Sequence, residues 1–125
     1  MTNNIEAILL DMGGTLRRTS KHSSEEMQQR IPAIMDILGA PGDPGEFMRI
    51  LSDRFSAYQR WSDETLIEAN EGELWTRWML PDWPIGKVSE NALLLNRFWR
   101  EALAERTLLP ETKDVIIQLF RSGYR

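Results

Sequence analysis

Five residues near the N-terminus bring an acid, two glycines, a hydroxyl and a guanidinium together: Asp11, Gly13, Gly14, Thr15 and Arg17. A carboxylate in such a setting can act as a nucleophile, as a metal ligand, or as both. Glycines allow the backbone to approach a phosphate closely and to direct its N–H groups at the phosphate oxygens. The residue types therefore predict chemistry on a phosphate or a related group.

The other polar groups of this stretch leave alternatives open. The hydroxyl of Thr15 could hydrogen-bond the Asp11 carboxylate or a bound phosphate oxygen. Mg²⁺ suits a site made of a carboxylate, a carbonyl and waters. Arg17 could contact an anionic substrate, although a solvated loop position is the ordinary alternative for such a residue. A strand followed by an acid and glycines also occurs as plain turn chemistry.

The element that must position Asp11 is the apolar run Ala7–Leu10. Continuous apolarity predicts a strand buried on both faces, as in a parallel sheet. An acid at the carboxyl end of such a strand points into the crevice where open α/β sheets hold ligands. The polar stretch that follows, 13–24, is interpreted as a loop. Such a strand needs neighbours on both edges, and the sequence offers no clear second strand.

The rest of the chain has the spacing and end signals of helices. Gly39 and Gly123 are expected to stop the first and last of them. The last helix should bury Val115, Ile116, Leu119 and Phe120. The expected helices begin at Ser23 or Ser24, at Asp43–Pro44, at Glu71 (to Leu80), at Val88 (to Leu103) and at Pro110.

Composition excludes several classes of function. The chain has 125 residues, a net charge of -4 and no cysteine. The absence of a basic surplus argues against a nucleic-acid or membrane partner. Without cysteine, and with His22 as the single histidine, thiolate and multi-histidine metal sites are excluded. No apolar stretch is long enough to span a bilayer. A cytoplasmic location is expected, because the chain has no cysteine and its N-terminus lacks the features of a signal peptide.

The segment AILLDMGGTL resembles the first motif of the haloacid dehalogenase (HAD) superfamily, a hydrophobic strand followed by D-x-D-G-T-L. The segment LLPETKDVIIQLFRSGYR is similar to the helix that returns to the core in the branch with a helical C1-type cap. The resemblance implies an α/β fold with a HAD-like Rossmannoid core. Residues 1–16 and 108–125 would supply only its first strand and return helix. Residues 17–107 would form the inserted α-helical cap.

The resemblance also assigns roles to the motif. Asp11 matches the nucleophile and, with the backbone carbonyl of Gly13, the Mg²⁺ ligands. Gly14 and Thr15 match the glycine and the threonine of the motif. Gly13 departs from the pattern, because family phosphatases carry a general acid and base there, whose loss typically costs roughly 10²–10⁴ in rate. Dehalogenase and phosphonate-cleaving branches also lack this acid, so all three chemistries stay open.

The remaining family motifs are a Ser or Thr, a Lys and an acidic pair, and they would follow Arg125. The chain is therefore expected to be the N-terminal part of a hydrolase for a small phosphorylated or halogenated substrate, and inactive alone. One alternative is a phosphate-binding segment of the actin-like or sugar-kinase fold, in which the glycines lead straight into a hairpin. The other is a non-catalytic helical interaction module that associates with itself or with a partner.

Overall fold

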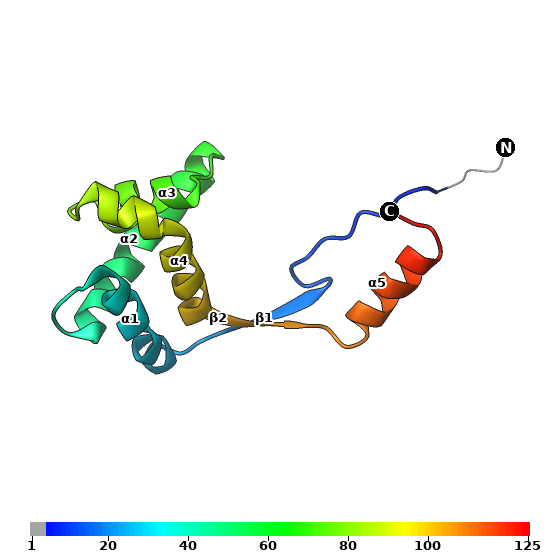
Figure 1. The fold of residues 1–125 in the computed structure, drawn as a ribbon, viewed down its shortest axis with the longest axis horizontal. Coiled ribbons are helices and arrows are strands. Elements are labelled where there is room, and N and C mark those ends of the chain that lie inside the picture. The colour runs from blue at the N-terminus through cyan, green and yellow to red at the C-terminus, as the bar shows by residue number, and fades with distance from the viewer. Residues whose placement is uncertain (1–4) are drawn as a thin grey trace. The chain divides into compact units, whose positions relative to one another are not determined.

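The computed structural model describes residues 5–125, which are mostly helical with one two-stranded antiparallel sheet (Figure 1). The chain divides into two compact units. The helical unit is His22–Leu103. The second unit, here called the terminal unit, joins the residues up to Lys21 with Ala104–Arg125.

The first helix of the helical unit, α1 (Ser24–Leu38), begins and ends as its sequence predicts. The Ser23 hydroxyl accepts a hydrogen bond from the Glu26 amide, and the Ser23 amide donates to the Glu26 carboxylate at 2.7 Å. These two bonds form a capping box, which satisfies amides that the first helical turn leaves without partners. Gly39 ends the helix with φ of 64°, a conformation that glycine adopts without strain.

The second helix, α2 (Pro44–Thr65), starts at the predicted cap, where the Asp43 carboxylate accepts a hydrogen bond from the Glu46 amide at 2.8 Å. The predicted third helix is a single turn, α3 (Glu71–Glu73), that continues as a π-helix, η1 (Leu74–Met79). In a π-helix an amide bonds to the carbonyl five residues earlier instead of four, and the Leu80 amide bonds in this way to the Trp75 carbonyl. Helix α4 (Ile85–Leu103) completes the unit.

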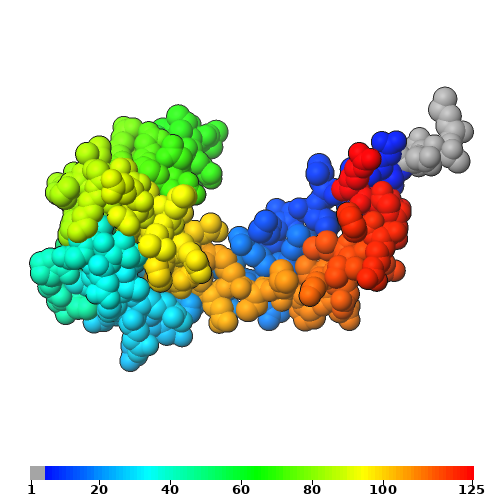
Figure 2. All heavy atoms as spheres, viewed as in Figure 1, coloured from blue at the N-terminus to red at the C-terminus, as the bar shows by residue number. Residues whose placement is uncertain are grey.

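The core of the helical unit lies between these helices. Trp75 and Trp99 are fully buried in it, which makes them packing residues. Figure 2 shows the outer face of this unit, coloured from cyan to yellow. The fully buried aliphatic and methionine side chains are Ile31, Ile34, Leu38, Leu51, Met79, Leu80, Val88 and Leu95.

The terminal unit contains the sheet and the last helix. Strand β1 (Arg17–Lys21) pairs antiparallel with β2 (Ala104–Leu108), with Arg17 opposite Leu108 and Lys21 opposite Ala104. Helix α5 (Thr112–Arg121) follows β2. The interpretation of 13–24 as a loop is therefore wrong for residues 17–21, and β2 is the second strand that the sequence did not reveal.

The predicted buried strand at Ala7–Leu10 is also wrong within the described residues. Leu9 is 98% exposed, and no parallel sheet forms in residues 5–125. The physical reason is the lack of ladder partners, because only Arg125 pairs with this segment. The Arg125 amide donates to the Glu6 carbonyl at 3.2 Å, and the Ile8 amide donates to the Arg125 carbonyl at 3.1 Å. These two bonds are the pattern of one parallel residue pair, Ala7 opposite Arg125.

Helix α5 has the predicted location, but its apolar face is not buried. Phe120 is 77% exposed, and Val115 and Ile116 are also exposed. An amphipathic helix normally buries its apolar face against a sheet. The described residues contain only a two-stranded sheet, which is too small to bury the apolar face of α5. None of the helices within residues 5–125 is long and apolar enough to cross a membrane.

Two leucines of α4 test the position of the core. Leu95 is fully buried, whereas Leu93, two residues earlier, is 74% exposed. We expect Leu95→Ala to lower the free energy of unfolding by about 2–5 kcal/mol, because it removes buried methyl groups and leaves a cavity. The matched change Leu93→Ala should stay within about 0.5 kcal/mol in urea denaturation. Equal losses in the two variants would contradict the described core.

The capping box of α1 predicts a pH dependence. The hydrogen bonds from the Ser23 amide and hydroxyl lower the pKa of Glu26 below its usual 4.5. A lowered pKa in the folded state adds stability at pH values above 4.5, and this is lost as pH falls through the folded pKa. Glu26→Gln should therefore be less stable than the wild type near neutral pH, and the difference should shrink in acid.

The control for this experiment is Glu25→Gln, because Glu25 lies in the same first turn without a capping hydrogen bond. Each variant removes one negative charge, so comparing the two by urea denaturation at pH 7 and pH 3 corrects for the general loss of charge. A Glu26→Gln penalty that persists unchanged at pH 3 would show that the carboxylate is not the stabilising group.

Candidate functional site

The predicted site residues come together in one compact turn that connects the segment 5–11 to β1. The Met12 carbonyl accepts hydrogen bonds from the amides of Leu16 and Arg17, at 3.0 and 3.1 Å. The Gly14 amide donates to the Arg17 carbonyl at 2.9 Å. These backbone hydrogen bonds stabilise the turn without a contribution from any side chain.

The two glycines differ in their conformations. Gly14 has φ of 75°, which L-residues with a side chain rarely adopt, whereas Gly13 does not have a positive φ. A Cβ atom at either position would meet no other atom within 4 Å. Gly14 is therefore required by the backbone, and its amide, expected to face a phosphate, is instead bonded within the turn.

A carbonyl at the end of the turn joins it to the returning chain. The Leu16 carbonyl accepts a hydrogen bond from the Leu109 amide at 2.9 Å and another from the Thr112 hydroxyl at 3.1 Å. Thr112 is buried, so this second bond satisfies a polar group that would otherwise be costly. The start of α5 thus holds the turn in place.

Sequence reasoning did not identify Leu109 or Thr112. Leu16 and Thr112 are 96 positions apart, so no local spacing connects them. The only signal for this contact was Thr112 itself, two residues after Pro110. Threonine is common near the start of a helix as an ordinary capping residue, so it did not indicate a distant contact.

The side chains of the turn present two contrasting groups. Asp11 and Thr15 are exposed, and within residues 5–125 neither side chain takes part in a hydrogen bond or ion pair. The Nε of Arg17 is buried and has no hydrogen-bond partner among the same residues. An unpaired buried donor is unfavourable, and an anionic acceptor would satisfy it.

The donor set of this turn fits a metal only in part. The Asp11 carboxylate and the Gly13 carbonyl are oxygens of the kind that Mg²⁺ prefers. Across the described chain, however, no three acidic or histidine side chains gather into a group that could hold a metal. The turn by itself therefore does not form a complete metal site.

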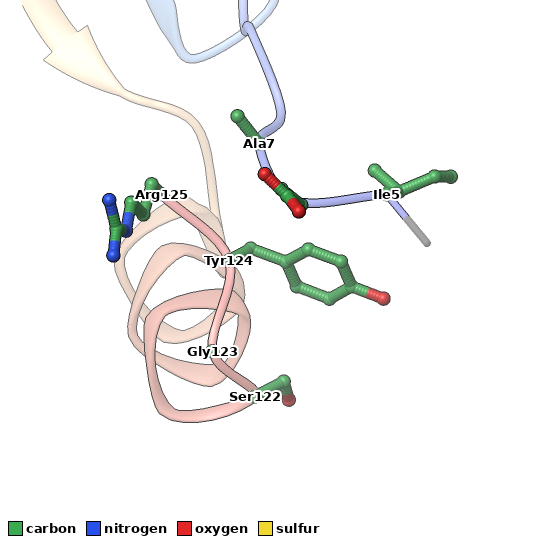
Figure 3. Close-up of a pocket in the computed structure, with 7 residues that line it drawn as sticks. Ile5, Ala7, Ser122, Gly123, Tyr124 and Arg125 are labelled. Atoms are coloured by element: carbon green, nitrogen blue, oxygen red, sulfur yellow. The ribbon is translucent and has the colours of Figure 1, made fainter. Parts of the chain in front are cut away.

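A cavity of about 840 Å³ lies elsewhere in the terminal unit (Figure 3). Its lining comes from residues 5–7 and 122–125, and Tyr124 extends toward Ile5 while the Arg125 side chain points away. This is the opposite end of the N-terminal segment from Asp11. None of the predicted site residues lines this cavity, so it is separate from the candidate site.

Comparisons of the chain with protein-family models, with curated proteins and with solved structures found no match. The interpretation of the turn consequently depends on its own residues and on the elements around it. Three features surround the turn: the parallel pair of Ala7 and Arg125, the helical unit that follows β1, and the hydrogen bonds between the Leu16 carbonyl and the start of α5.

The two glycines give a matched test of the turn. Gly14→Ala should lower the free energy of unfolding of the terminal unit by about 1–2 kcal/mol, because alanine is strained at this positive φ. Gly13→Ala should have a smaller effect, because its added Cβ meets nothing. Amide hydrogen exchange of Leu16 and Arg17 measures both changes. Equal exchange in the two variants would contradict the described turn.

Proposed function

We propose that this chain is the N-terminal part of a HAD-like hydrolase in which Asp11 is the nucleophile. The fold of the complete enzyme would be an α/β Rossmannoid core with a helical cap, acting in the cytoplasm on a small phosphorylated or halogenated substrate. The observation that carries the proposal is the position of the DMGGT turn. It lies at the carboxyl end of a segment that pairs in parallel with Arg125, four residues after the end of α5.

The order of elements supports the same proposal. The resemblance predicts a helical cap inserted shortly after the first motif, followed by a return helix. Along the chain the helical unit His22–Leu103 follows β1 and precedes β2, and β1 begins two residues after Thr15. The chain then returns along β2 and enters α5. An inserted unit of this kind is the expected arrangement for a cap.

The proposed chemistry follows from the groups in the turn. A carboxylate oxygen of Asp11 attacks the phosphorus or the halogen-bearing carbon, the leaving group departs, and water then hydrolyses the covalent ester or acyl phosphate. The Arg17 guanidinium would pair with the anionic part of the substrate. Gly13 cannot donate a proton to the leaving group. The site is therefore better suited to a substrate whose leaving group departs without protonation.

The proposal includes Mg²⁺ as the cofactor of the complete enzyme, with the Asp11 carboxylate and the Gly13 carbonyl among its ligands. Divalent cations neutralise charge on a transferring phosphoryl group, which is their usual contribution. Further ligands would have to come from outside the described residues, because no three acidic or histidine side chains gather among them into a group that could hold a metal.

Strand pairing favours this proposal over the actin-like alternative. In that fold the glycines lead into a strand that forms a hairpin with the strand before them. Here β1 pairs with β2, which lies on the far side of the helical unit in the sequence. The second alternative, an interaction module, draws support from exposed Leu93 and Leu94 on α4.

The test compares two polypeptides. The purified 125-residue chain should show no Mg²⁺-dependent turnover of phosphorylated or halogenated compounds, because phosphoryl transfer needs several positioned charges and this chain has few. The gene should be sequenced past the Arg125 codon, and any longer polypeptide expressed. In an active longer polypeptide, Asp11→Asn should reduce kcat by roughly 10⁴–10⁶.

Asp36→Asn is the matched control, because Asp36 is exposed on α1 in the helical unit. It should leave kcat unchanged. Turnover by the 125-residue chain itself would refute its expected inactivity alone, and full activity of Asp11→Asn would refute Asp11 as the nucleophile. A frame that continues without a Ser or Thr, a Lys and an acidic pair would also count against it.

A further inference from the structure

The outer face of helix α4 carries an exposed apolar side chain at its middle. Leu93 is 74% exposed and its neighbour Leu94 is 41% exposed, whereas Leu95 is fully buried in the core. The face continues on both sides of Leu93 with exposed polar residues, Ser89 before it and Arg97 after it. A leucine in this position is a contact that a second helix can bury.

Opposite charges flank Leu93 on this face. Glu90 lies three residues before it and Arg97 four residues after it, and residues at these spacings share one face of a helix. The Arg97 guanidinium donates to the Glu101 carboxylate at 3.0 Å, an exposed pair on the same helix. Within residues 5–125 the Glu90 carboxylate makes no ion pair. Its negative charge is therefore available to a partner.

We propose that α4 packs antiparallel against α4 of a second copy of this chain, with Leu93 of the two copies in contact on a two-fold axis. A helix rises about 1.5 Å per residue, so Glu90 of one copy is level with Arg97 of the other to within about one residue. The two-fold axis forms this pair twice, because every contact in such an interface is repeated.

Charge complementarity selects this occupant and this direction. In a parallel pair, Glu90 of one copy and Arg97 of the other would be seven residues apart, about 10 Å along the axis, so they could not pair. A partner without positive charge at the matching level would leave a carboxylate unpaired at the interface, which is unfavourable. A second copy supplies that charge and a matching leucine from the same face.

The size of the contact predicts its strength. One helix from each copy makes an interface below the roughly 1,200 Å² of a standard one, so the dimer is weak and forms at high protein concentration. In dilute solution the chain is monomeric, so Leu93→Ala can be neutral in urea denaturation and still weaken the dimer. None of the predicted site residues lies on α4, so the dimer is independent of the proposed hydrolase activity.

Single cysteines test the position of the two-fold axis, because the chain has no cysteine of its own. Two helices packed about 8–10 Å apart bring facing residues within reach of a disulfide. Under mild oxidation, full-length Leu93→Cys should form a disulfide-linked dimer at least about tenfold faster than the control Ser89→Cys. In the antiparallel pair the two copies of residue 89 are about 12 Å apart along the axis, beyond the reach of a disulfide. Non-reducing gel electrophoresis measures both rates.

Charge reversal tests the pairing of Glu90 with Arg97. Glu90→Arg places like charges opposite each other and should raise the dimer dissociation constant about two- to tenfold at low salt. The double variant, Glu90→Arg with Arg97→Glu, restores opposite charges and should return the constant close to the wild-type value. Leu93→Ala should raise it about tenfold or more, because each dimer loses two leucine side chains. Sedimentation equilibrium measures the constants, and circular dichroism confirms that each variant is folded.

The proposal fails if the chain stays monomeric up to roughly 1 mM. It also fails if Leu93→Cys and Ser89→Cys cross-link at equal rates, which is the result expected of a parallel pair or of random collision. A dimer whose dissociation constant does not respond to Glu90→Arg would place the contact elsewhere on the chain and would equally overturn the proposal. These measurements do not use turnover, so their failure leaves the hydrolase proposal intact.

Discussion

The antiparallel pairing of β1 with β2 is the interaction on which the rest of the terminal unit depends. It runs from Arg17 opposite Leu108 to Lys21 opposite Ala104, and the His22 amide extends it with a bond to the Leu103 carbonyl. Closing a loop costs entropy that rises only slowly with loop length. A short ladder can therefore close a long insertion, provided that the insertion has its own core, as His22–Leu103 does.

The same pairing explains why the catalytic candidates and α5 belong to one unit. Once β2 returns beside β1, Leu109 and Thr112 reach the Leu16 carbonyl and fix the turn. Without the ladder, nothing local in the sequence would bring the start of α5 to the Leu16 carbonyl at the end of the turn. The helical unit can thus vary in size without changing the turn, because the two strands alone determine where the chain leaves and returns.

Helix ends could be predicted from the sequence, and strands could not, for a physical reason. A cap is local, so Ser23, Gly39 and Asp43 carry their signals within four residues of the bonds they make. A strand exists only with a partner. Strand β1 is polar and lacks the apolar alternation by which a strand is predicted from sequence. Its partner, β2, follows the whole helical unit in the sequence. Ala7–Leu10 has the composition of a buried strand but finds one pairing residue within the described chain.

The polar groups of the turn show how its local geometry limits what it can recognise. The Gly14 amide is bonded to the Arg17 carbonyl, so it cannot also hold an anion. The amides of Gly13 and Thr15 donate to no other backbone group within residues 5–125, and the Arg17 Nε is unpaired there. An anionic substrate beside the Asp11 carboxylate is repelled unless positive charge compensates. Within the turn that charge comes from Arg17, so under the proposed function its guanidinium is the group that would offset the repulsion between an anion and the Asp11 carboxylate.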